Sequence, residues 1–113
     1  MKAGDIVLAF LPQADGAAKL RPALVLSEMP PYGDVLLCGV SSQLDRAVGG
    51  FDEVIRLNDA DFRASGLRIA SVMRLGFLAT FPLSRVSGVL GQIDPARLAR
   101  LLDNLVAHLR KQN

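Results

Sequence analysis

The chain has 113 residues, half of them hydrophobic, with a formal net charge of +2 and a pI of about 9.1. This length favours a single domain over residues 1–113 with a hydrophobic core of its own. No apolar stretch approaches the length of a membrane span, and Met1 to Asp5 lack the layout of a signal peptide. We therefore expect a cytoplasmic protein without membrane contact.

The composition also limits the chemistry. The small positive charge permits an anionic partner, but a chain with no Trp and one Tyr has few aromatic rings on which bases could stack. Cys38 is the one cysteine and lies in an apolar run, so we interpret it as a core residue. His108 has no neighbouring ligand residues, and we interpret it as a helix-surface residue. We expect neither a metal site nor a cofactor.

Short apolar runs separated by turn signals predict a series of strands. Pro12 is expected to end the first run, and 13–19 to form an exposed loop before a second strand that Pro22 opens. Gly76 is expected to break or bulge its strand. The predicted strands cover residues 6–11, 23–26, 35–40, 51–57, 67–75, 77–83 and 86–93.

Two segments carry helix signals. Asn58 or Asp59 is the expected N-cap of a short turn that ends at Ser65-Gly66, which also explains the acidic residues 59 and 61. Asp94-Pro95 predicts a longer helix to about residue 109. Its apolar stripe leaves Arg97 and Arg100 outside and consists of Leu98, Leu101, Leu102, Leu105, Val106 and Leu109. The pattern favours a mainly β small barrel with a C-terminal amphipathic helix.

Arg21 and Pro22 stand at the start of the apolar run 23–26. The ring of Pro22 holds the preceding residue in an extended conformation, which presents a guanidinium at the end of a core strand. A guanidinium suits phosphate because its planar fork donates several hydrogen bonds. The alternative is an ordinary surface arginine that pairs with a nearby carboxylate.

Several segments in order resemble the PemK/MazF-type toxins. Gly4-Asp5-Ile6-Val7 and Arg21-Pro22-Ala23-Leu24-Val25-Leu26-Ser27 match the two opening motifs of that family. Val40-Ser41-Ser42-Gln43 takes the place of its paired hydroxyl residues, and Gly50-Phe51 opens the next strand. Ser65-Gly66-Leu67 and Ser71-Val72-Met73-Arg74-Leu75 resemble its Gly-Leu and Val-Arg block. The resemblance covers residues 4–75, with the terminal helix in its usual place.

The resemblance implies an SH3-like small barrel, usually a homodimer, that cleaves single-stranded RNA without a metal. The substrate's own 2′-OH attacks the adjacent phosphate in such a reaction. Arg21 would stabilise the developing charge and Arg74 would supply a second cation. The RNA-binding positions would be Lys19, Ser41, Ser42 and Gln43. The expected protein partner is an antitoxin with a disordered acidic segment.

The chain departs from the family at the acid and base positions. Some members carry an Asp two residues after the second arginine, where this chain has Gly76. The loop before Arg21 holds Asp15 as its only acid, and not in register. These departures predict weak cleavage. They also leave open a non-catalytic growth inhibitor or a protein-binding SH3-like module.

Overall fold

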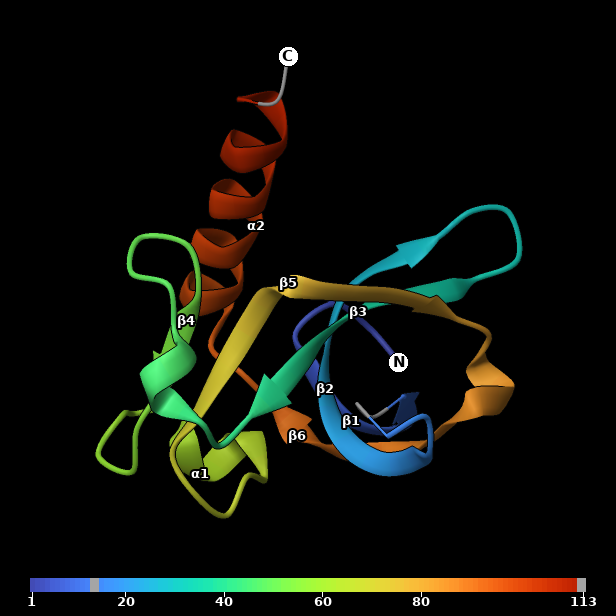
Figure 1. The fold of residues 1–113 in the computed structure, drawn as a ribbon, viewed down its shortest axis with the longest axis horizontal. Helices are drawn as coiled ribbons and strands as arrows, with labels where there is room; N and C mark the ends of the chain where they lie inside the picture. Colours follow the sequence, from blue (N-terminus) through green and yellow to red (C-terminus); the bar gives the residue numbers. More distant parts are fainter. Residues whose placement is uncertain (13–14, 112–113) are drawn as a thin grey trace.

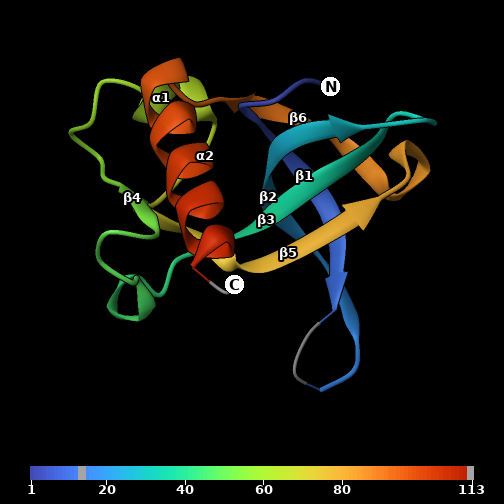
Figure 2. The ribbon, with the colours of Figure 1, turned by 90° about the horizontal axis from the view of Figure 1, so that it is seen from above.

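The computed structural model describes residues 1–12 and 15–111. Six antiparallel strands form one sheet in the order β4-β5-β3-β2-β1-β6. The sheet curls into a half-barrel, with α2 standing against one side of it (Figure 1, Figure 2). The elements are β1 (Asp5–Pro12), β2 (Ala18–Met29), β3 (Asp34–Ser41), η1 (Leu44–Arg46), β4 (Glu53–Ile55), α1 (Phe62–Ser65), β5 (Ser71–Phe81), η2 (Leu83–Arg85), β6 (Val86–Gln92) and α2 (Pro95–Arg110). The mainly β barrel and the C-terminal helix were both predicted correctly.

The core has two parts because alternate residues of a strand point to opposite faces of the sheet. On the helix face, Leu24 and Leu26 of β2 pack with Leu101 of α2. On the second face, Ala23 and Val25 pack in a separate cluster with residues of β1, β3 and β5. None of the helices within the described ranges is long and apolar enough to cross a bilayer.

Pro22 lies inside β2 rather than at its start, so the predicted strand opening is wrong. The strand begins at Ala18, and Pro22 stands opposite Leu8 of β1. Pairing of β2 with β3 extends only to Ala23. The position without an N–H therefore falls where one side of the strand has no neighbour, which is where proline is tolerated. Lys19 belongs to this paired extension and not to the expected loop; residues 13 and 14 of that loop lie outside the described residues.

Gly76 lies in a bulge, which is one of the two outcomes predicted for it, a strand break or a bulge. Cys38 of β3 pairs with Leu78, but the next residue, Gly39, pairs with Arg74, so residues 75–77 are extra. The strand nevertheless continues to Phe81, which joins two predicted strands into one. It begins at residue 71 instead of 67, and β4 keeps only three of the seven residues predicted for it.

The helix predictions were partly correct. In α2, Asp94 is the N-cap and its Oδ1 accepts a hydrogen bond from the Ala96 N–H at 2.8 Å. The stripe is displaced: Leu101 and Leu105 are buried, whereas Val106 is 54% exposed. The buried edge of the helix instead includes Arg97, which is 7% exposed, so its placement outside the stripe was wrong.

The short helix α1 starts later than predicted. Its N-cap is Asp61, not Asn58 or Asp59, and the Asp61 side chain makes no capping hydrogen bond. Cys38 is a core residue, as expected, and burial raises the pKa of its thiol to about 12.

Candidate functional site

The strand order brings the predicted site residues to one end of the second face. Ala23 of β2, Gly39 of β3 and Arg74 of β5 form one row across three adjacent strands. Arg21 lies two residues before Ala23 on the same face, and the same register would set it opposite Ser41. Arg21, Ser41 and Arg74 therefore share one end of one sheet face, although they are far apart in the sequence.

The spacing of these residues follows from sheet geometry. In a regular sheet, two residues separated by one intervening strand and by two positions along the strand lie about 10 Å apart across the sheet and about 7 Å apart along it. β2 pairs with β3 only from Ala23 onward, so Arg21 lies two residues beyond the part of the sheet to which this spacing applies.

The cations at this end have no ion-pair partner in the described part of the chain. Within residues 1–12 and 15–111, no carboxylate forms an ion pair with Arg21, Arg74 or Lys19. Arg21 and Lys19 are exposed, and Arg74 is half-buried. The alternative of a surface arginine paired with a carboxylate thus does not hold for Arg21 in the part of the chain that is described. These cations remain available to an anion from outside.

The hydroxyl and amide residues of the predicted site lie at the end of β3 and in the turn that follows it. Ser41 ends β3 and is half-buried, and its Oγ accepts a hydrogen bond from the Gln43 N–H at 3.1 Å. Its hydroxyl hydrogen can still be donated to an anion. Ser42 and Gln43 follow in the turn before η1, and both are exposed. All six predicted residues therefore belong to β2, β3, β5 or the turn after β3.

The expected acid and base are not supplied by the residues considered from the sequence. Gly76 is exposed in the bulge and carries no side chain. His108 is exposed on α2, as predicted, with its ring centroid 4.8 Å from that of Phe51. Among the described residues, no group of His, Cys, Asp and Glu has an arrangement suited to a metal ion.

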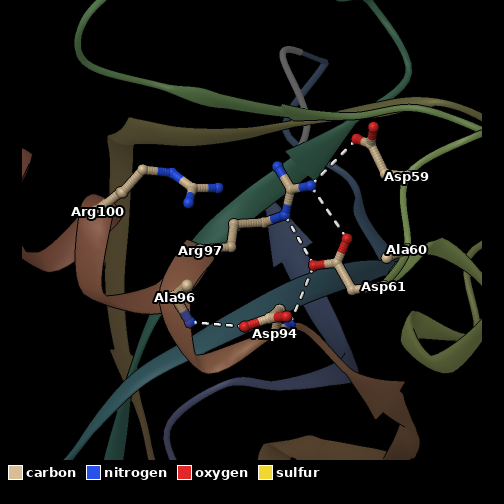
Figure 3. A pocket seen from close by; sticks show the side chains of 7 residues that line it. All are labelled: Asp59, Ala60, Asp61, Asp94, Ala96, Arg97 and Arg100. Carbon is tan, nitrogen blue, oxygen red and sulfur yellow. Dashed lines mark hydrogen bonds and ion pairs between the residues drawn. The ribbon is translucent and has the colours of Figure 1, made fainter.

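A second polar cluster lies on the helix face, around Arg97 of α2 (Figure 3). Its Nε donates to Asp61 at 2.8 Å, and its two terminal nitrogens donate to Asp61, Asp59, Glu53 and the Val54 carbonyl at 3.0–3.1 Å. Arg100 also donates to Glu53, at 2.9 Å. A cavity of about 200 Å³ lies beside this cluster.

This cluster has the properties of a structural element. Hydrogen bonds from Arg97 hold the pKa of Asp61 below its ordinary value, and the same contacts raise the pKa of Arg97. Every guanidinium nitrogen of Arg97 is already bonded to protein, so it has no donor left for a ligand. The cluster joins α2 to β4 and to the segment before α1.

Sequence reasoning missed two residues whose side chains join distant segments of the chain. Arg97 precedes the buried Leu101 and Leu105 by one and two helical turns, and that spacing could have identified it as a buried residue. Asp52 was passed over although its carboxylate connects two segments next to Arg74. No local pattern marks Asp52, because its partner Leu75 lies 23 residues further along the chain.

Comparisons with known proteins agree with this geometry. A family model described as "PemK-like, MazF-like toxin of type II toxin-antitoxin system" matches residues 2–109. Among solved structures, the fold is similar to that of the Mycobacterium tuberculosis toxin MazF-mt6, with a TM-score of 0.69 and 18% sequence identity. That similarity covers 94% of this chain and 96% of the other. No curated protein sequence matches the chain. Because the family model matches nearly the whole chain, this protein belongs to the PemK-like, MazF-like toxins of type II toxin–antitoxin systems.

Proposed function

We propose that this toxin is an endoribonuclease that cleaves single-stranded RNA by attack of the 2′-OH on the adjacent phosphate. The observation that carries the proposal is that Arg21 and Arg74, which form no ion pair within the described residues, lie toward the same end of one sheet face as Ser41. Toxins of this family are generally endoribonucleases. A flexible single strand fits an open sheet end, because its backbone is free to follow the cations.

In the proposed reaction, the 2′-oxygen forms a bond to phosphorus and the bond from phosphorus to the 5′-oxygen breaks. The products are a 2′,3′-cyclic phosphate and a 5′-hydroxyl. Arg21 stabilises the extra negative charge that the phosphate acquires in the transition state, and Arg74 supports the same charge from β5. Ser41, Ser42, Lys19 and Gln43 bind the substrate.

The proton transfers are the weak part of this site. One proton must leave the 2′-OH and another must reach the 5′-oxygen. The position two residues after Arg74 is glycine, so a carboxylate is missing where some relatives have one. We therefore expect slow turnover. This same observation favours the second candidate, a non-catalytic growth inhibitor that binds its target through Arg21.

Substitutions at Arg21 distinguish the two candidates. Arg21→Ala should lower RNA cleavage about a hundredfold or more while the protein stays folded, because the lost interaction acts in the transition state. Arg21→Lys should rescue poorly, since an ammonium group cannot replace the planar fork. Arg63→Ala, an exposed arginine of α1, is the matched control. Unchanged cleavage in Arg21→Ala would refute the site; growth inhibition without cleavage would favour the second candidate.

The proposed protein partner is an antitoxin whose disordered, acidic segment lies across Arg21 and blocks RNA. A segment that folds on binding can cover a wide surface, and its carboxylates would pair with cations that form no ion pair within the described residues. We also propose that the toxin is a homodimer. Sedimentation at micromolar concentration should show the dimer, and a single monomer species would contradict it.

A further inference from the structure

The ladder between β4 and β5 ends abruptly next to Arg74. Its three pairs are Ile55 with Ser71, Val54 with Val72 and Glu53 with Met73. The same register would next set Asp52 opposite Arg74 and then Phe51 opposite Leu75, where the carbonyl of Phe51 could accept the N–H of Leu75. That carbonyl instead accepts a hydrogen bond from Asn104 Nδ2 of α2, at 3.0 Å.

The side chain of Asp52 replaces the backbone carbonyl as the hydrogen-bond acceptor for Leu75. Asp52 Oδ1 accepts the hydrogen bond from the Leu75 N–H at 3.0 Å, across 23 residues of sequence. Its other oxygen, Oδ2, accepts from the Val48 N–H at 2.9 Å. One half-buried carboxylate therefore joins two backbone segments: β5 directly after Arg74, and the loop that follows the Ser41–Gln43 turn.

The hydrogen bond between Asp52 and Leu75 lies at the first residue of the bulge. The bulge in turn determines the position of Arg74, the last residue before it. Residues 75–77 are the extra ones, so the hydrogen bond to Leu75 fixes the point at which β5 leaves the regular ladder. The middle of the bulge has little packing of its own: a Cβ built on Gly76 would meet no atom within 4 Å. At its far end, the Phe77 ring lies over Gly39, the residue opposite Arg74.

We propose that Asp52 is a positioning residue of the RNA site, acting through the backbone of Leu75 to hold the Arg74 side chain beside Ser41. This inference rests on the proposed endoribonuclease function for its kinetic consequence.

The chemistry of the contact predicts an order of variants. A carboxylate can accept both N–H groups at once, whereas an amide has one acceptor oxygen and presents an NH₂ group to the other N–H. Asp52→Asn should therefore keep at most one bond, and Asp52→Ala keeps neither. Asp45→Asn is the matched control, because Asp45 is an exposed carboxylate in η1 of the same loop.

The test is a double-mutant cycle on RNA cleavage with the full chain. At a temperature where all variants are folded, Asp52→Asn should lower kcat at least tenfold, with a smaller change in KM, and Asp45→Asn should change neither. In the Arg74→Ala background, Asp52→Asn should lower kcat less than twofold further, because the residue acts through Arg74. Fully additive losses in the double variant would overturn the inference.

A second measurement separates this inference from the proposed function. In ¹⁵N NMR spectra, Asp52→Asn should shift the Leu75 amide signal and the Arg74 side-chain Nε–H signal, and Asp45→Asn should shift neither. A wild-type protein that cleaves no RNA would refute the proposed function, and the NMR signals would then decide the positioning role alone. Unshifted Leu75 and Arg74 signals in Asp52→Asn would overturn it, whatever the RNA assay shows.

Discussion

Removing the Arg97 side chain should destabilise the fold more than any other single charge deletion on α2. Arg97 makes five hydrogen bonds, four of them to carboxylate oxygens, and is 7% exposed. Arg97→Ala would leave Asp61 buried without a counter-charge. Deleting one partner of a buried ion pair typically costs about 3–5 kcal/mol. The free energy of unfolding of a small domain is about 5–15 kcal/mol, so this loss would remove a large part of the total stability.

Arg100→Ala is the matched control for this experiment. Arg100 lies one turn further along α2 and pairs with Glu53, but its side chain is 54% exposed. Exposed ion pairs contribute about 0–1 kcal/mol, so its removal should have little effect. Urea denaturation followed by circular dichroism gives the free energy of unfolding for each variant. Equal losses for Arg97→Ala and Arg100→Ala would refute the reasoning that burial makes the Arg97 cluster strong.

The remaining predictions concern acid, the helix face and the cysteine. The folded pKa of Asp61 lies below its ordinary value of 3.8, so its contribution to stability is present above that pH and is lost as the pH falls below it. Acid titration of stability should therefore show a smaller loss for Arg97→Ala than for the wild type, and identical acid losses would contradict the assigned cause. Leu101→Asp should unfold the protein, because Leu101 is fully buried, whereas Val106→Asp on the exposed side should fold; circular dichroism distinguishes them, and a folded Leu101→Asp would refute the helix packing. Cys38, with its thiol pKa raised to about 12 by burial, should resist alkylation at pH 8 until urea unfolds the chain, and rapid labelling of the native protein would contradict its core position.

Local chemistry explains the parts of the fold that could be predicted. The N-cap Asp94 and Pro95 at the first helical position act within one turn of chain, so the start of α2 follows from the sequence. The apolar runs of β1 and β3 likewise predict buried strands, because their side chains fill the core from both faces.

Long-range pairing explains the parts that could not. The local sequence around Pro22 predicts the start of a strand. A proline fits inside β2 at this position because β3 stops pairing with β2 at Ala23. Gly76 interrupts a sequence pattern and yet β5 continues, because β3 pairs with the strand on both sides of the bulge. Arg97 was assigned to the solvent side of α2 because its burial depends on three carboxylates from distant segments.

The candidate site shows the same division. Arg21, Arg74 and Ser41 were identified by resemblance to a family, but their meeting at one end of one face follows from the strand order β5-β3-β2. Asp52 was not identified, because its hydrogen bond to Leu75 replaces a backbone contact that the Phe51 carbonyl, bonded to Asn104 of α2, does not make. The residue types led to the hypothesis of an anion-binding site. The strand order determines which of these residues lie at the same end of one sheet face.

The most direct test of the account is to map the RNA ends that the purified protein produces. A long single-stranded RNA is incubated with wild type and Arg21→Ala in the presence of EDTA, and the new ends are sequenced and tested for phosphate. We expect wild type to leave 2′,3′-cyclic phosphate and 5′-hydroxyl ends, and Arg21→Ala to leave about a hundredfold fewer of them. Ends carrying a 5′-phosphate, or equal cleavage by both proteins, would contradict the proposed reaction at Arg21.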